Sequence, residues 1–515
     1  MPADFDVFII GGGINGTGIA RDAQGRGLRT GLAEMNDLAS ATSSASTKLF
    51  HGGLRYLEFF EIRLVRKALI EREVLLSAMP HISWPMRFVL PYHKDMRFDG
   101  DTPTSRLLSV FMPWMKGRRP AWLIRFGLFL YDNLGGRKVL PATTTLDLAT
   151  TSEGRPLKGR FKKAFEYSDC WIEDARLVVL NARDAQMRGA TIMTRTKVTR
   201  AERVGDLWEI TLDGPKGVQT VTASALVNAG GPWVEDVIQD KISVDATEGV
   251  RLVRGSHIVT KRLFDHDKSY FFQGEDGRII FAIPYETDFT LIGTTDADHD
   301  DVNVAPTATE AEQDYLIAFA NQYFEQQISR ADVVWTYSGV RPLYDDGAKS
   351  ATAATRDYVL TLNDDGPALL NIFGGKITTY RKLAENALKK LGHDGAWTQG
   401  VALPGGDFPV LGRDDVMRDL MAKFPFLSEA WALRLVRAYG TLAAQMLDGA
   451  KVAADLGADF GATLTAREVD WLIQTEFAQT ADDVVWRRSK LGLRLTPDQI
   501  DAIDRYMSAA LGDPK

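Results

Sequence analysis

A glycine-rich turn close to the start of the chain has the residue types and spacing that bind a dinucleotide. Gly11, Gly13 and Gly16 follow the order G-x-G-x-x-G, and Glu34 stands 23 positions after Gly11. The first glycine permits a tight turn, the second lets backbone approach a pyrophosphate, and the third lets a helix pack against a strand. A carboxylate at Glu34 can accept hydrogen bonds from the 2′- and 3′-hydroxyls of an adenosine ribose, and it would repel a 2′-phosphate.

The elements that must position this turn are also present in the pattern. Residues 7–10 form a short run of β-branched and aromatic side chains, which predicts a buried parallel strand. An amphipathic helix is predicted over 14–26 and a second strand over 30–33, ending at Glu34. Strand, turn, helix and acidic residue together predict a dinucleotide site, whereas the glycines alone are equally typical of an ordinary turn.

The residues after the second strand favour FAD over a nicotinamide cofactor. Residues 40–47 are eight consecutive Ser, Ala and Thr residues, small enough for backbone and hydroxyl groups to contact a long ligand. A dense polar set follows, with Lys48, His51, Gly52, Arg55 and Tyr56. Because a nicotinamide dehydrogenase more often continues into a second βα unit here, we predict FAD.

Two more glycine-rich turns follow predicted strands farther along the chain. One strand leads into Ala229 and Gly230, and another, over 368–372, leads into Gly374 and Gly375. After the stretch 373–381 a helical pattern runs to about Leu391, and a helix N-terminus preceded by two glycines would offer N–H groups and a positive dipole suited to the anionic edge of a reduced flavin. Each turn alone is typical of any βα connection, but three of them predict one extended cofactor contacted from distant segments.

Composition limits the classes of protein that fit. The chain has 515 residues, 45% of them hydrophobic, and a net charge of −7, which does not suggest nucleic-acid binding. Its single cysteine, Cys170, excludes an internal disulfide, a Cys-x-x-Cys pair and an iron–sulfur cluster, and we expect no metal site. No signal peptide and no spanning helix are predicted.

Residues 37–58 closely resemble the signature of FAD-dependent sn-glycerol-3-phosphate dehydrogenases. Further similarity lies at 253–257, 338–343, 355–357, 374–381 and 482–493, in order along nearly the whole chain. Two features depart from the family pattern. Ala41 stands where a glycine is expected, which should matter little if its φ is negative, and the stretch 93–119 is longer.

The resemblance implies an α/β fold with three parts. A Rossmann-like FAD-binding domain of the glutathione-reductase/D-amino-acid-oxidase type would be built from 1–60, 220–235 and 365–390. An antiparallel sheet over 245–362 would cap the substrate. The FAD-binding domain and this sheet together would occupy residues 1–400. An all-helical domain is expected over 401–515, with capping boxes at Thr465 and Thr496.

The resemblance also implies an activity: oxidation of sn-glycerol 3-phosphate to dihydroxyacetone phosphate, with hydride transfer from C2 to flavin N5 and electrons passed to a quinone. His257 is expected to be the general base for the C2 hydroxyl, with Arg341 at the developing alkoxide. Arg341 could instead share the proton-transfer role. Lys376 is expected either at the substrate phosphate or between substrate and flavin.

The remaining site residues fall into two sets. The phosphate is expected to bind to cationic and hydroxyl side chains, namely Arg55, Tyr56, Arg356 and Lys376. FAD is expected to contact Gly11, Gly13, Asn15, Gly16, Glu34, Ser44, Thr47, Lys48, His51, Gly52, Ala229, Gly230, Gly375, Ile377 and Thr378.

Residues 102–131 combine basic and large apolar side chains with no acidic residue after Asp101 until Asp132. The basic residues are Arg106, Lys116, Arg118, Arg119 and Arg125. This composition is typical of an interfacial segment on anionic lipid, although a core-packed helix with a basic face has the same pattern. The resemblance implies peripheral membrane attachment. Together with this composition, it predicts a cytoplasmic protein attached peripherally to the inner face of the plasma membrane. The oligomeric state stays open, with a homodimer as one option.

Three other functions remain in consideration. An oxidase of the same fold would pass the electrons to oxygen, and an amine or amino-acid oxidase would need a carboxylate clamp in place of a phosphate site. A non-catalytic flavin-binding protein would hold FAD that no substrate can reduce.

Overall fold

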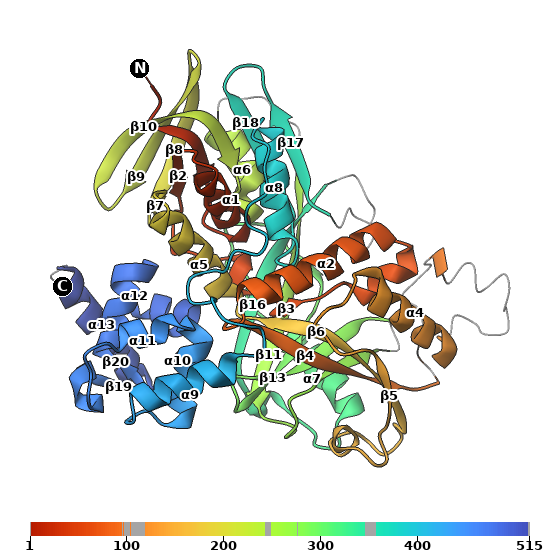
Figure 1. Ribbon diagram of the computed structural model, residues 1–515. Helices are drawn as coiled ribbons and strands as arrows, with labels where there is room; N and C mark the ends of the chain where they lie inside the picture. The colour runs from red at the N-terminus through yellow and green to blue at the C-terminus, as the bar shows by residue number, and fades with distance from the viewer. Residues whose placement is uncertain are drawn as a thin grey trace.

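The computed structural model describes residues 2–94, 96, 103–104, 119–242, 249–274, 277–345 and 357–512. Within this part of the chain, two large sheets form the body of the molecule, and a mostly helical C-terminal region contacts the segments around both (Figure 1).

The first sheet joins parallel strands from distant parts of the sequence. β1 (Phe5–Ile10) lies between β2 (Thr30–Ala33) and β10 (Gly217–Asn228). β18 (Ala368–Phe373) pairs with β10, β7 (Thr191–Met193) pairs with β2, and β17 (Val359–Asn363) closes the edge antiparallel to β18. The predicted strands and their parallel arrangement are confirmed.

Side chains along β1 point alternately to the two faces of this sheet, and both faces are covered. Val7 and Ile9 pack in a cluster with α1 (Ile14–Gly25) and α8 (Tyr380–Lys390). Phe8 and Ile10 point the other way, against the hairpin of β8 (Lys197–Val204) and β9 (Leu207–Gly214). Burial on both faces explains why the strand is a continuous apolar run.

The second sheet is mainly antiparallel, as expected for 245–362, and its order is β15-β11-β14-β13-β12-β4-β6-β3. It also recruits two long strands that the sequence pattern did not predict, β4 (Ser83–Tyr92) and β6 (Lys163–Ile172). β16 (Val333–Tyr344) pairs with β11 (Val250–Lys261) along almost its whole length. The other members are β3 (Leu49–Phe50), β5 (Thr144–Asp147), β12 (Ser269–Gln273), β13 (Ile279–Tyr285), β14 (Phe289–Gly293) and β15 (Ala297–Asp298).

Helices cover both faces of this sheet. α7 (Glu310–Tyr323) shares a core with one face, through residues such as Leu316 and Phe319. On the other face, α2 (Ile62–Ala78) and α4 (Ala121–Leu134) pack through Val65, Leu69 and Leu128.

α4 lies at the edge of the molecule (Figure 1), and it exposes an apolar stripe. Trp122, Phe126 and Phe129 are 56%, 53% and 59% exposed, and their spacing places them on one face of the helix. The basic part of the prediction is partly wrong. Arg119 is buried and bound to Glu58 at 2.6 Å, so it cannot belong to a surface patch. Arg125 is exposed, whereas Arg106, Lys116 and Arg118 lie outside the described residues.

The described part of the C-terminal region is mostly helical, as expected, with five α-helices and one short strand pair. Thr496 forms the predicted capping box with Gln499. Thr465 makes no side-chain cap hydrogen bond, and the Glu468 carboxylate, which would form the other half of the box, is bound by Arg434 and Tyr439. The elements are α9 (Arg413–Lys423), α10 (Glu429–Tyr439), α11 (Leu442–Met446), α12 (Ala466–Glu476), α13 (Pro497–Leu511), β19 (Asp459–Gly461) and β20 (Leu464–Thr465). In the described ranges, none of the helices has both the length and the apolar character needed to cross a bilayer.

Candidate active site

Three glycine-rich turns meet at one edge of the first sheet. β1, β10 and β18 run parallel, so their carboxyl ends lie together, and each leads into a turn predicted to contact the cofactor. A Cβ added at Gly11 would meet the Ala229 carbonyl oxygen at 2.5 Å, so only glycine allows this approach. Asn15 donates from Nδ2 to the Gly374 carbonyl over 3.0 Å, which joins the first turn to the third.

The third turn is followed by the expected helix, after a short intervening turn. α8 begins at Tyr380, and a turn over 377–379 separates it from Gly375. The helix N–H groups therefore do not stand directly behind Gly375, whose own φ of +101° favours glycine. Thr378 is buried in this turn and Ile377 packs against a core cluster.

Glu34 lies at the carboxyl end of β2 beside the first turn. Its carboxylate accepts hydrogen bonds from the N–H groups of Gly12 at 2.6 Å and Asn36 at 2.8 Å. Burial raises the pKa of Glu34, while these two hydrogen bonds act in the opposite direction. The backbone thus aims the carboxylate along the glycine turn.

The run of small residues folds as a loop between the two sheets. Ala41 has a φ of −116°, so the alanine in place of the family's glycine is accommodated as expected. Thr42 donates to the Val340 carbonyl of β16, and a Cβ at Gly339 would meet Ala45 at 2.6 Å. The loop therefore lies directly against the strand that carries Arg341.

Lys48 points away from this loop surface into the protein. Its ammonium is fully buried and donates to Asp174 at 2.8 Å and to the Ser44 carbonyl at 3.0 Å. Any contact of Lys48 with the cofactor would therefore be through its backbone, while the side chain holds the loop to α5 (Asp174–Met187).

His257 lies on β11, facing the same loop. Its Nε2 is 3.0 Å from the Thr47 hydroxyl, and its ring stacks on Tyr337 with centroids 4.6 Å apart. Nδ1 is buried and has no hydrogen-bond partner among the described residues. Burial lowers the pKa of His257 well below its usual value, and the charges of Lys48 and Arg341 act in the same direction. The ring is therefore neutral at physiological pH and able to accept a proton.

Glycines on the sheet face make room for these side chains. A Cβ at Gly293 would meet His257 Cδ2 at 2.1 Å, and one at Gly255 would meet Arg341 Nη2 at 2.5 Å. Arg341 reaches Thr294 Oγ1 at 3.5 Å and forms an ion pair with Asp296. Its side chain is 41% exposed, so the guanidinium is accessible from solvent.

The predicted phosphate residues are brought together in part. Tyr56, in the 3-10 turn Leu54–Phe59, lies under Lys376, whose Nζ is 4.3 Å from the ring centroid. Arg55 belongs to the same turn. Arg356 lies outside the described residues, so its position stays a prediction.

The backbone of Gly52, next to His51, is held from behind by a buried network. Gly52 N–H donates to the Tyr131 hydroxyl at 2.7 Å, and Tyr131 donates to Asp169 at 2.7 Å. Arg72 pairs with the same carboxylate at 2.5 Å. Burial lowers the pKa of His51, and the charge of Lys376 adds to this effect.

Several residues of this site were not found from the sequence. Tyr337 stands one position before the motif quoted at 338–343, and it lies directly opposite His257 in the β11–β16 register. The two-residue period of β16 places Tyr337 and Arg341 on one face, a signal that could have revealed it. Asp296 and Asp174 gave no such signal, because only the tertiary fold brings them to their partners.

The described residues fit FAD. The glycine turn has no side chain where a pyrophosphate would approach Gly13, apart from Ser43, whose Oγ would lie 3.2 Å from an added Cβ. Asn15 Oδ1 is buried and has no partner among the described residues, as expected of an atom that faces a ligand. Glu34 occupies the position suited to an adenosine ribose.

Comparison with known proteins gives a concordant result. Residues 6–381 match the family described as FAD dependent oxidoreductase, and residues 396–512 match the C-terminal domain of alpha-glycerophosphate oxidase. The chain is 47% identical to a D-erythritol 1-phosphate dehydrogenase of Brucella abortus, with 96% of each chain covered. It is 46% identical to a glycerol-3-phosphate dehydrogenase of Pseudomonas aeruginosa, covering 98% of this chain and 95% of that one.

The chain belongs to the family of FAD-dependent glycerol-3-phosphate dehydrogenases. A solved structure supports the same assignment: the glycerol-3-phosphate dehydrogenase of Bacillus halodurans complexed with FAD superposes with a TM-score of 0.75 at 26% identity. That match covers 99% of this chain and 92% of the other. The predicted fold class and the predicted FAD cofactor are thereby confirmed, and the chain is an FAD-dependent oxidoreductase.

Proposed function

We propose that this protein oxidises sn-glycerol 3-phosphate to dihydroxyacetone phosphate and passes the electrons to a membrane quinone. The observation that carries the proposal is the position of His257, a buried neutral base that faces the flavin-side loop beside Arg341. Relatives that are 45–46% identical over nearly their whole length carry the name glycerol-3-phosphate dehydrogenase, which supports the substrate.

The side chains around the site divide the work of the reaction. When bound, FAD supplies the hydride acceptor, with its N5 atom receiving the hydride of C2. His257 removes the proton of the C2 hydroxyl, and Arg341 stabilises the developing negative charge on that oxygen. Arg55, Tyr56, Arg356 and Lys376 bind the phosphate, for which planar guanidinium groups are well suited.

Anaerobic titration of the purified yellow protein with sn-glycerol 3-phosphate tests the activity. We expect the flavin absorbance to fall in proportion to added substrate, and glycerol to be far less effective because it lacks the phosphate. Retention of the flavin absorbance at saturating substrate would contradict the proposal and favour a non-catalytic flavoprotein. Reduction by amines or amino acids instead would favour the oxidase alternative.

The electron acceptor needs a separate test, because residues 396–512 match a domain named after an oxidase. After anaerobic reduction, we expect a short-chain quinone to reoxidise the flavin quickly and an oxygen pulse to do so slowly, with little peroxide. Rapid peroxide formation would identify an oxidase instead.

A second substrate has support from one relative, the 47% identical protein named D-erythritol 1-phosphate dehydrogenase. D-Erythritol 1-phosphate has the same phosphate group as sn-glycerol 3-phosphate but a longer carbon chain. Comparison of kcat/KM for the two phosphoesters decides between them, and a preference for the four-carbon substrate would revise the proposal without changing the roles of the site residues.

We also propose that the protein lies on the cytoplasmic face of the plasma membrane, attached through α4. The exposed side chains of Trp122, Phe126 and Phe129 form the apolar contact, and the exposed Arg125 lies beside them in sequence. Aromatic side chains suit the boundary between headgroups and acyl chains.

A further inference from the structure

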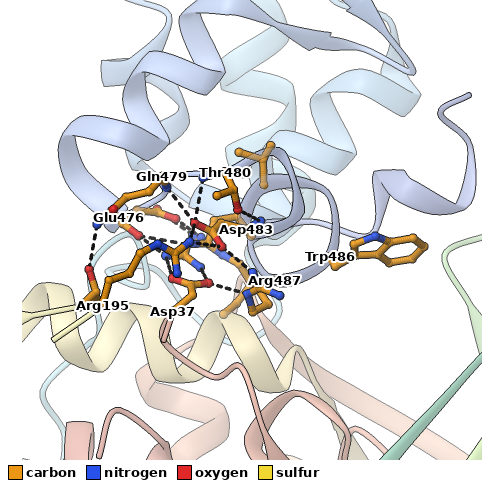
Figure 2. A network of polar contacts seen from close by, with 12 residues as sticks. Asp37, Arg195, Glu476, Gln479, Thr480, Asp483, Trp486 and Arg487 are labelled. Atoms are coloured by element: carbon orange, nitrogen blue, oxygen red, sulfur yellow. Dashed lines mark hydrogen bonds and ion pairs between the residues drawn. The ribbon is translucent and has the colours of Figure 1, made fainter. Parts of the chain in front are cut away.

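The motif at 482–493 lies far from the flavin residues in sequence, yet it binds one of their loops. The carboxylate of Asp37 is buried and receives hydrogen bonds from Arg488 at 2.5 and 2.8 Å. Arg487 adds a third, at 2.5 Å (Figure 2). Both arginines belong to the π-helical segment Asp483–Arg488 of the C-terminal region. Two guanidinium groups on one buried carboxylate are a strong and geometrically specific attachment.

Asp37 lies in the loop that supports the dinucleotide turn. Ala39, two residues later, donates its N–H to the Gly12 carbonyl at 3.3 Å, and a Cβ at Gly12 would meet Leu38 at 2.8 Å. On the other side of Asp37, the Asn36 N–H binds the carboxylate of Glu34. A shift of Asp37 would therefore move both the glycine turn and the residue aimed at the ribose.

A second attachment reaches the same loop from its other side. Asp483 is fully buried and pairs with Arg195 at 2.7 Å (Figure 2). The backbone N–H of Arg195 donates to the Asn36 carbonyl at 2.9 Å. Asp483 also contacts Arg487, so the two attachments form one closed network around residues 36–37.

The same segment touches the catalytic side of the site through aromatic rings. Trp486 stacks on Trp335 of β16, with centroids 4.7 Å apart. Trp335 lies 5.0 Å from Tyr337, which in turn stacks on His257 at 4.6 Å. In Figure 2, Trp486 extends away from the arginine network, so one short segment has contacts in two directions.

We infer that Asp483–Arg488 is a positioning element of the active site, which holds the FAD-binding loop through Asp37 and the ring of His257 through Trp486, Trp335 and Tyr337. The C-terminal region, which we take to begin at residue 401, thereby sets how tightly FAD is retained and how the base is oriented. The first role depends only on the FAD fold, whereas the second rests on the role proposed for His257.

Two matched substitutions test the first role. Arg488→Gln removes the paired contact with Asp37, together with the hydrogen bonds from Arg488 to the Glu476 carbonyl, and leaves Arg487 in place. The control, Arg176→Gln, removes the ion pair with the Glu476 carboxylate, which joins the same region to α5 without contacting Asp37. Arg183 still lies 3.5 Å from Glu476, so each variant leaves its buried carboxylate one cationic partner. The measurement is the rate of FAD release from the diluted holoenzyme, followed as the gain in flavin fluorescence.

We expect Arg488→Gln to speed FAD release about tenfold or more, as for a lost charged hydrogen bond, and Arg176→Gln to change it less than about threefold. The two variants should lower the unfolding temperature by similar amounts. Equal acceleration of FAD release in both variants would mean that only domain docking matters, and no acceleration in Arg488→Gln would overturn the role directly. Arg488→Lys, which keeps the charge and loses the paired geometry, should give an intermediate rate and serves if the glutamine variant does not fold.

Trp486 tests the second role. We expect Trp486→Ala to lower kcat/KM about tenfold with FAD release unchanged, and Trp486→Phe, which keeps an aromatic ring, to restore most of it. Unchanged turnover in Trp486→Ala would overturn this role if His257→Ala is inactive. If His257→Ala is itself active, the role proposed for His257 as the base is wrong. The FAD-release result still decides whether Asp483–Arg488 holds the FAD-binding loop.

Discussion

The ring of His257 stacks on Tyr337, and its Nε2 lies beside the Thr47 hydroxyl. The positive charges of Lys48 and Arg341 are near enough to lower its pKa. Its pKa lies well below the usual value, mainly through burial, so the neutral form that accepts a proton persists at acidic pH. We expect the acidic limb of kcat/KM against pH to lie below about 6.5, the pKa of an unperturbed histidine. Arg341→Gln removes a cationic neighbour, so it should move this limb upward by about half a pH unit. A limb that stays in place would show that Arg341 does not face the base.

Removal of the base gives the most direct test at this scale. His257→Ala should lower kcat by about 10²–10⁴-fold, the usual contribution of a general base. FAD content, measured from the absorbance spectrum of the purified variant, should stay at one equivalent per chain, because His257 lies on the second sheet, away from the glycine turns. Near-normal turnover would instead assign proton removal to Arg341 or to water.

Arg55 tests the phosphate site. Arg55→Ala should raise KM for the phosphorylated substrate about 10- to 100-fold, as expected for a lost hydrogen bond between charged groups. Turnover of glycerol, which has no phosphate, should change little. Equal losses on both substrates would show that Arg55 supports the loop and does not bind phosphate.

At the scale of elements, β11, β14 and β16 form the part of the second sheet on which the catalytic side chains lie. Glycines in these strands leave room for the side chains of His257 and Arg341. Gly293→Ala would place a methyl group 2.1 Å from the His257 ring, so the ring must move. We expect kcat/KM to fall on the order of 100-fold, as for a displacement of about 1 Å, with FAD content unchanged. Gly159→Ala, at a position with no atom within 4 Å of an added Cβ, is a suitable control and should behave as the wild type.

The sequence predicted those elements whose signal is local. The strand at 7–10, the helix after Gly13 and the strand at 30–33 were found because apolar runs and glycine spacing act over a few residues. The pairing of β4 with β6 and the pairing of Tyr337 with His257 could not be predicted, because register between distant strands leaves no local pattern. Only the place of Tyr337 on the same face of β16 as Arg341 had a local signal. The box expected at Thr465 failed for a similar reason: Arg434, which is close only in the fold, binds Glu468.

At the scale of the whole molecule, α4 joins the surface to the site. Its outer face bears Trp122, Phe126 and Phe129, while its inner face carries Tyr131, which accepts the Gly52 N–H beside His51. Substitution of the three outer residues by Ser should abolish sedimentation with phosphatidylglycerol vesicles at low salt, because the apolar contact is lost. Substitution of three exposed apolar residues elsewhere, Val218, Val304 and Leu411, should leave sedimentation unchanged. Equal sedimentation of both triple variants would exclude α4 as the attachment.

The contacts that complete the flavin site join residues that the ribosome adds early to residues that it adds much later. Gly374 follows its partner Asn15 by 359 positions, and Arg488 follows Asp37 by 451. While the ribosome is still at work, β1 and β2 are exposed without β10 and β18, and such unpaired parallel strands are prone to aggregate. We therefore expect tight FAD binding only after the segment that carries Arg488 has been synthesised, and we expect β1 and β2 to need protection from aggregation until then.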